Sequence, residues 1–233
     1  MCGRYTLAKK EKLKELLQGR FQIDFDEFSH IRLVPRFNVA PTQQVPVVLQ
    51  EDGRRKLTPA RWGLVPFWAK PGSKPLINAR AETVATNGAF RDAFKSRRCL
   101  VPADGFYEWA TTPMGKVPHH FTLKDDGLFA FAGIWEPMTT TDGAKVPTLS
   151  LITTTPNEMV ATVHNRMPVI LTPEREAAWL DGSTPPETLT SFLTPYPADR
   201  MKERAVSTRL NSAKVDSPDL LEPAASEEFR LES

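Results

Sequence analysis

Cys2 is the residue of this sequence best equipped for covalent chemistry, because it stands directly behind the initiator methionine. Removal of Met1, which is usual before a small second residue, leaves a thiol and a free α-amine on Cys2. The amine titrates at about 8 and a free thiol at about 8.5, so both are partly nucleophilic at neutral pH. Such a 1,2-aminothiol condenses with an aldehyde to an imine, and its thiol then closes a thiazolidine ring intramolecularly.

Glu108 is the first candidate for proton transfer in support of such chemistry. It lies between Tyr107 and Trp109 in the segment VPADGFYEW. A carboxyl group among aromatic side chains is expected to have a raised pKa, which suits general acid–base catalysis. An ordinary surface pair between Glu108 and an arginine is the alternative.

Two further segments place polar residues two positions apart. INARAET carries Asn78 and Arg80, and TVHNRMPVIL carries His164 and Arg166 just before an apolar run. Alternation along an extended strand would put each pair on one face. His164 could equally be a satisfied core or edge histidine.

Three classes of function are compatible with these residues taken alone. An N-terminal-nucleophile hydrolase would use Cys2 with its own amine as base and would need an oxyanion hole. A lyase would act on a DNA aldehyde through a Schiff base of the Cys2 amine, and a nucleic-acid-binding module would not use Cys2 at all. Because Cys2 and Cys99 show no paired-ligand spacing with any histidine, we expect neither a metal nor another cofactor.

Composition places the chain among globular proteins. Its 233 residues are 40% hydrophobic and 25% charged, which suits one large or two small domains. No apolar run approaches the length of a membrane span, and the N-terminus lacks the apolar core of a signal peptide. With only two cysteines there is no disulfide framework, so we expect an intracellular protein without membrane contact.

Charge is distributed unevenly along the chain. Residues 216–233 hold six acidic residues and Arg230, which gives them a net charge of −5. Because the whole chain has a net charge of +2, residues 1–215 carry +7. A basic body suits a polyanionic partner, although a modest excess of lysine and arginine is common in proteins without one.

The pattern of elements predicts an α+β fold, a single β-rich domain of barrel-like sheets with a few flanking helices. Short apolar runs alternate with turn signals at Asp52-Gly53 and at 141–143, and FTLKDDGLFAF (121–131) predicts a hairpin. Helices are predicted at 8–17, from the N-cap Thr172 to about Asp181, and at 185–193. We expect one domain over 2–222 and an acidic, loosely held tail over 223–233.

Nine segments, in this order along the chain, resemble the SRAP (SOS response-associated peptidase) family. They are MCGRYTL, RFNVAPTQ, RWGLVPFWAK, INARAET, FRDAFKSRRCLVPADGFYEW, FAGIWE, TLSLITTTPN, HNRMPVIL and VSTRLNSAKVDSPDL. The resemblance spans residues 2 to about 220. It implies a YedK-like abasic-site processing protein with a single SRAP domain.

The resemblance also implies a reaction and a partner. The family crosslinks covalently to the aldehyde of abasic sites in single-stranded DNA, through a thiazolidine on the N-terminal cysteine, and removes its own Met1. A bacterial member would be cytoplasmic, nucleoid-associated when bound to DNA, and monomeric. Hydrolase or lyase chemistry remains the alternative.

The resemblance to the family also implies a role for each candidate site residue. Cys2 would form the bond, Asn78 would orient the cysteine or the sugar, Glu108 would move protons, and His164 would assist sugar opening and reversal. The DNA-binding residues implied by the resemblance are four arginines that would hold phosphates and two tryptophans that would stack on bases: Arg4, Arg36, Arg80, Arg166, Trp68 and Trp109.

Overall fold

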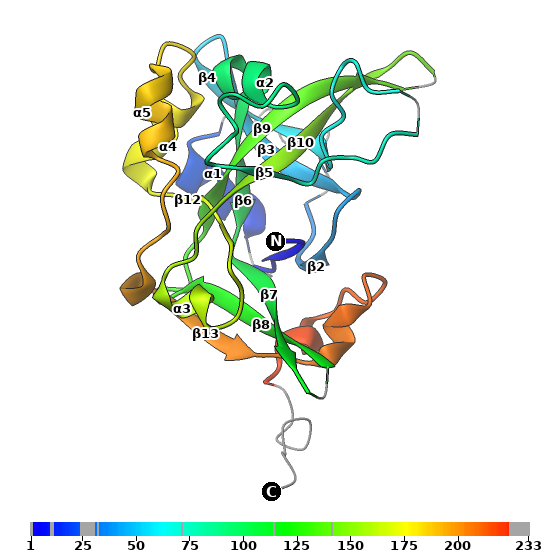
Figure 1. Ribbon diagram of the computed structural model, residues 1–233, viewed down its shortest axis with the longest axis vertical. Helices are drawn as coiled ribbons and strands as arrows, with labels where there is room; N and C mark the ends of the chain where they lie inside the picture. Colours follow the sequence, from blue (N-terminus) through cyan, green and yellow to red (C-terminus); the bar gives the residue numbers. More distant parts are fainter. Residues whose placement is uncertain are drawn as a thin grey trace, which may run out of the picture.

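A computed structural model provides the structure of the protein and describes residues 2–9, 12–23, 31, 33–70, 72–113, 115–140 and 142–223. Two sheets form its framework, one above the other in the view of Figure 1. Of the predicted tail, only Pro223 lies among the described residues, where it bridges to Val206. Within the described residues no helix is both long and apolar enough to cross a bilayer.

The upper sheet closes on itself as a barrel of five strands, paired in the order β10-β4-β3-β6-β9 and back to β10. Closure removes the exposed edges that an open sheet would leave. Shorter strands extend it, since β5 and β11 pair with β10 and β12 pairs with β9. The strands are β3 (Gln44–Glu51), β4 (Arg54–Trp62), β5 (Asn78–Arg80), β6 (Arg98–Ala103), β9 (Phe129–Thr139), β10 (Lys145–Thr154), β11 (Met167–Pro168) and β12 (Ile170–Leu171).

The lower sheet is open and has the order β13-β8-β7-β1-β2. Its strands are β1 (Arg4–Leu7), β2 (Arg36–Val39), β7 (Gly105–Thr112), β8 (Gly115–Leu123) and β13 (Met201–Ala205). Phe106 and Phe121, stacked at 5.1 Å between ring centroids, face the barrel and join its core. The predicted class, α+β with barrel-like sheets, is confirmed.

The helices are short and flank the sheets, as predicted. Helices α4 and α5 and the Asp52-Gly53 turn, which joins β3 to β4 with positive φ at both residues, match the sequence prediction. The helical elements are α1 (Leu13–Phe21), α2 (Arg91–Ser96), α3 (Glu158–Ala161), α4 (Pro173–Leu180), α5 (Pro186–Ser191), η2 (Ala198–Arg200), η3 (Thr208–Asn211) and η4 (Pro218–Leu221).

Two predicted elements are wrong in detail. The helix predicted over 8–17 begins only at Leu13, because the backbone N–H groups of Ala8 and Lys9 donate to the Asp104 carboxylate instead. The predicted hairpin over 121–131 does not form, because β8 pairs with β7 and β13 whereas β9 pairs within the barrel. Both apolar runs are real strands, but the chain crosses from one sheet to the other between them.

Candidate active site

Cys2 lies just before β1 and is fully buried. Asn78, the first residue of β5, donates through Nδ2 to the Cys2 carbonyl oxygen at 2.9 Å. The Cys2 thiol donates to the Arg4 carbonyl oxygen at 3.8 Å. Burial, and next the negative charge of Glu108, raise the pKa of the Cys2 thiol, so the sulfur carries its proton until a base removes it.

Glu108 projects from β7 toward the same region, and its side chain is only 3% exposed. In the β7–β8 register it lies opposite His119, on the face that also carries Phe106 and Phe121. Burial raises the pKa of Glu108 from 4.5 to about 7, as its aromatic neighbours in the sequence predicted. The carboxyl group can therefore both give and accept a proton near neutral pH.

His164 faces Glu108 from the loop that joins α3 to β11, with its Nδ1 3.9 Å from Oε2 of the carboxylate. The Arg166 backbone N–H donates to the same Nδ1 at 3.1 Å. Burial lowers the pKa of His164, and the positive charge of Lys116 adds to that effect, so the neutral imidazole is favoured. The prediction that His164 and Arg166 lie on a strand is wrong, because the strand begins at Met167.

Glu108 and His164 line a pocket of about 530 Å³ between the β7–β8 hairpin and the C-terminal segment, whereas Cys2 is not part of the lining. Of the residues predicted from sequence, Arg4, Glu108, Trp109 and His164 line it. The Arg4 guanidinium carbon lies 5.9 Å from the centre of a Trp109 ring, a cation–π contact. A cation and an aromatic plane thus stand at the edge of the cavity that holds the proton-transfer groups.

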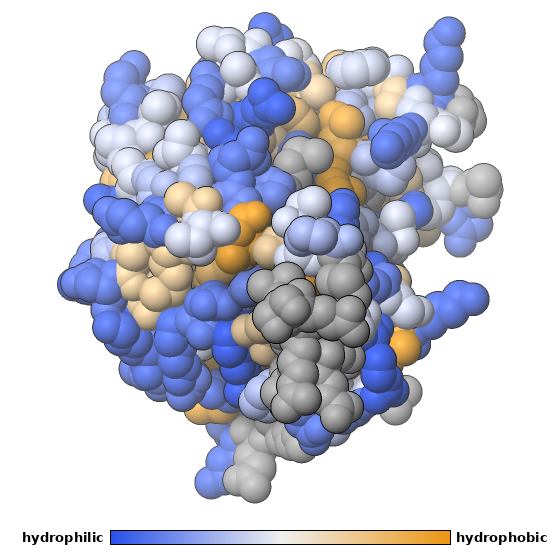
Figure 2. All heavy atoms as spheres, turned by 60° about the horizontal axis from the view of Figure 1, so that its bottom comes forward, coloured by the Kyte–Doolittle hydropathy of each residue, from blue (hydrophilic) through white to orange (hydrophobic). Residues whose placement is uncertain are grey.

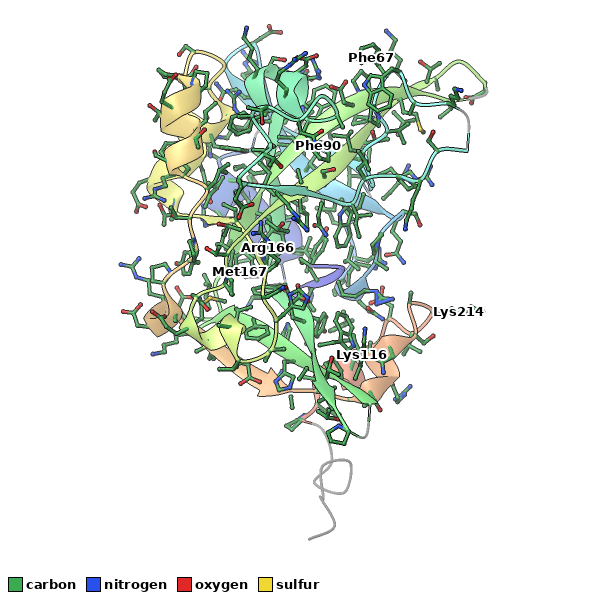
Figure 3. The ribbon with its side chains drawn as sticks, viewed as in Figure 1. Phe67, Phe90, Lys116, Arg166, Met167 and Lys214 are labelled. Atoms are coloured by element: carbon green, nitrogen blue, oxygen red, sulfur yellow. The ribbon has the colours of Figure 1, made fainter. Side chains whose placement is uncertain are left out.

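Arg166 lies near the pocket but is already engaged. Its guanidinium donates to both oxygens of Glu82, at 2.5 and 3.0 Å, and to the Thr153 carbonyl oxygen at 2.6 Å. Figure 3 shows it at the centre of the molecule, beside Met167 and above Lys116. Any anion bound by Arg166 would have to compete with Glu82.

Three other predicted DNA-binding residues lie outside the pocket lining. Arg36 pairs with Asp216 and donates to Gln43, which ties β2 to the C-terminal segment. Arg80 is exposed at the end of β5, and Trp68 is 59% exposed in the loop between β4 and β5.

Sequence reasoning missed several residues of this region. Lys116, Asn211 and Thr111 line the pocket, and the Trp109 indole N–H donates to Asn211 Oδ1 at 2.7 Å. Phe67, 77% exposed beside Trp68, is the most exposed large apolar side chain among the described residues (Figure 3). The β7–β8 pairing that brings Lys116 to the pocket gave no chemical signal in the sequence.

The arrangement offers a carboxyl group of pKa about 7 and a neutral imidazole at one cavity, and a buried thiol that interacts electrostatically with the same carboxyl group. This set suits a nucleophilic sulfur with a nearby proton donor and acceptor. No group of three histidine, cysteine, aspartate or glutamate side chains able to hold a metal occurs among the described residues.

Comparison with known proteins gives consistent matches along almost the whole chain. The family model for SOS response associated peptidase (SRAP) matches residues 1–213. Abasic site processing protein YoqW of Bacillus subtilis is 42% identical over 95% of this chain and 99% of its own, and YedK of Escherichia coli is 28% identical over 96% and 100%. A crystal structure of a protein from Bacteroides thetaiotaomicron superposes with a TM-score of 0.80, at 25% identity, over 96% of this chain and 100% of its own.

Proposed function

The chain belongs to the SOS response associated peptidase (SRAP) family, and from that premise we propose that it captures abasic sites in single-stranded DNA as a covalent adduct of Cys2. Relatives at 42% and 28% identity are named abasic site processing proteins. The observation that most supports the proposal is the placement of Glu108 and His164 at one pocket beside the buried Cys2.

The reaction starts from an aldehyde. An abasic deoxyribose interconverts between a closed hemiacetal and an open form with an aldehyde at C1′. His164, neutral because its pKa is lowered, can accept the C1′ hydroxyl proton as the C1′–O4′ bond breaks. Overall the proton moves from that hydroxyl to O4′, and the aldehyde is released within reach of Cys2.

The α-amine of Cys2, free once Met1 is removed, then adds to C1′ and gives a carbinolamine. Glu108 in its acid form protonates the departing hydroxyl, so that water leaves and a protonated imine remains. Asn78 donates a hydrogen bond to the Cys2 carbonyl oxygen and so fixes the orientation of Cys2 for the reaction.

Ring closure needs the thiol proton removed, because the pKa of the Cys2 thiol is raised. The carboxylate that Glu108 became in the previous step can take this proton as the sulfur attacks the imine carbon. The new S–C1′ bond closes a neutral thiazolidine, and Glu108 returns to its acid form. One carboxyl group of pKa about 7 therefore serves both steps.

The DNA would approach along the open side of the pocket. We assign phosphate contacts to Arg4 and Arg80, and base stacking to Trp68 and Trp109. Arg166 can join them by exchanging Glu82 for a phosphate. Arg36 would have to release Asp216 for the same purpose.

A denaturing gel tests the proposal directly. Protein shown by mass spectrometry to begin at Cys2 is mixed with a single-stranded oligonucleotide that carries one abasic site. We expect a shifted band that survives denaturation with the natural sequence and not with Cys2→Ala. An oligonucleotide with an intact base is the DNA control.

Two further arms separate the alternatives. Cys2→Ser keeps the amine and removes the thiol. If this variant cleaves the DNA strand as fast as the protein with Cys2 does, a Schiff-base lyase is favoured. Turnover of an amide substrate without adduct formation would favour a hydrolase. Absence of any Cys2-dependent adduct would overturn the proposal.

A further inference from the structure

Trp109 has two polar partners at the edge of the candidate site. Its indole N–H donates to Asn211 Oδ1 at 2.7 Å, and the guanidinium carbon of Arg4 lies 5.9 Å from the centre of one of its rings. All three residues line the pocket that contains Glu108. Arg4 lies opposite Tyr107 in the β1–β7 register, so Trp109, two positions along β7, is its diagonal neighbour on the same face of the sheet. A chain of contacts thus runs from the C-terminal segment through Trp109 to Arg4.

Asn211 is the last residue of η3, and the residues on both sides of it are anchored. Leu210 is fully buried in a small apolar cluster with residues of β2 and β7, against which Trp109 also packs. The Ser212 carbonyl oxygen accepts a hydrogen bond at 3.0 Å from Nδ2 of Asn38, a buried residue of β2. Figure 1 shows this C-terminal segment (orange to red) beside the β7–β8 hairpin. Although Asn211 itself is exposed, its backbone places the amide at a defined position.

The orientation of the Asn211 amide follows from its partner. An indole N–H can only donate, so the amide atom that faces it must be the oxygen. Because the Trp109 ring carries a single N–H, this hydrogen bond selects one rotation of the ring about its side-chain bonds. Asn211 therefore sets the plane that Trp109 presents to Arg4, and any base stacked on Trp109 would be oriented by the same bond.

Arg4 is held differently from two other arginines assigned to phosphate. Arg36 and Arg166 are each paired with a carboxylate. Within the described part of the chain Arg4 forms no ion pair, and its Nε is buried without a hydrogen-bond partner. Burial lowers the pKa of Arg4, so its charge has lost part of its hydration. The Trp109 ring stabilises such a cation without neutralising it, and the charge of Arg4 remains available to an anion.

We propose that Asn211 is a positioning residue for DNA binding, which acts through Trp109 to hold Arg4 at the pocket edge for a phosphate of the strand. The inference rests on the proposed function and adds to it a residue that carries no charge. Without the Asn211 bond the Trp109 ring is free to turn, and Arg4 loses the surface that holds it. Figure 2 brings the lower end of the molecule forward, and the surface visible there is mostly hydrophilic, which suits contact with a charged backbone.

Fluorescence anisotropy with an intact single-stranded oligonucleotide, at several salt concentrations, tests the proposal without requiring adduct formation. Arg4→Gln should lower the slope of log affinity against log salt by about 0.7, the share of one phosphate on a single strand. Asn211→Ala changes no charge, yet it should weaken binding about fivefold and lower the slope toward that of Arg4→Gln. Ser212→Ala, the exposed neighbour whose backbone makes the bond to Asn38, is the matched control and should change neither quantity.

A double-mutant cycle separates this role from direct contact between Asn211 and DNA. We expect Asn211→Ala to add no further loss of affinity in the Arg4→Gln background. Equal losses in both backgrounds with an unchanged salt slope would mean that the amide binds DNA itself, and would overturn the proposal. Unchanged affinity in Asn211→Ala alone would also overturn it.

The indole N–H resonance of Trp109, identified by its absence from Trp109→Phe, supplies a second readout. It should shift in Asn211→Ala and stay in place in Ser212→Ala, and an unmoved resonance in both would overturn the proposal. Adduct formation on an abasic oligonucleotide is measured on the same proteins. Because that reaction requires Cys2 whatever Asn211 does, normal adducts without the expected change in salt slope would overturn this inference alone.

Discussion

Glu108 should destabilise the folded protein at alkaline pH, and its replacement by glutamine should relieve that cost. The pKa of the carboxyl group rises from 4.5 in the unfolded chain to about 7 in the folded one. The folded state therefore binds a proton more tightly, and the full stability is present below pH 4.5 and is lost as pH rises through about 7.

The magnitude follows from the size of the shift. At 1.36 kcal/mol per pKa unit, a carboxyl group shifted in this way costs about 1 kcal/mol at pH 5 and about 3 kcal/mol at pH 8.5. The effect of Glu108→Gln on the unfolding free energy should thus be more stabilising at pH 8.5 than at pH 5 by about 2.5 kcal/mol. Any packing change in the variant is common to both pH values and cancels in this difference.

Urea unfolding of both proteins at pH 5 and pH 8.5 measures the difference. Glu187→Gln, an exposed position on α5, controls for the chemistry of the substitution. The same Glu108→Gln protein should form the abasic-site adduct about 10²- to 10⁴-fold more slowly, because glutamine neither gives nor takes a proton. A variant whose stability change is equal at the two pH values would refute the raised pKa, and unchanged adduct kinetics would refute the proton-transfer role.

Three other substitutions test the site and its support. Asn78→Ala removes the hydrogen bond to the carbonyl of the reactive cysteine and should slow adduct formation about tenfold in a gel time course, whereas unchanged rates would remove it from the site. Lys116→Gln should weaken binding to single-stranded DNA and lower the slope of log affinity against log salt by about 0.7, measured by anisotropy; an unchanged slope would place Lys116 off the DNA path. Gly105→Ala forces a Cβ against the His120 ring and should lower the unfolding free energy in urea by about 1–3 kcal/mol. Gly182→Ala, where a Cβ meets open space, is the control and should not lower it. Equal effects of the two substitutions would contradict the packing argument.

Local features of the sequence predicted the parts of the fold that depend on local interactions. The Asp52-Gly53 turn and the Thr172-Pro173 helix start both formed at the predicted positions, because positive φ and the fixed φ of a proline in the first helical turn are local properties. The Thr172 side chain makes no capping hydrogen bond. The hairpin at 121–131 failed because strand pairing depends on partners far along the chain. Nothing within those residues shows that β8 and β9 belong to different sheets.

The features of the candidate site likewise divide into those that the local sequence predicted and those that depend on tertiary packing. The raised pKa of Glu108 was predictable, because its aromatic neighbours in sequence indicated burial. The loop position of His164 and the bond between Arg166 and Glu82 were not, because each depends on how the α3–β11 loop packs over the barrel. Lys116 and Asn211 reach the pocket only through the tertiary arrangement of the β7–β8 hairpin and the C-terminal segment.

The most direct test of the central claim is the intact mass of the adduct between the protein and an abasic oligonucleotide, before and after borohydride. We predict the mass of the Cys2-initiated protein plus the oligonucleotide minus one water, with no gain of hydrogen on reduction, because a thiazolidine holds no reducible C=N bond. Proteolysis of the adduct should place the link on Cys2. A mass that rises by two hydrogens on reduction, or a link on any other residue, would contradict the account.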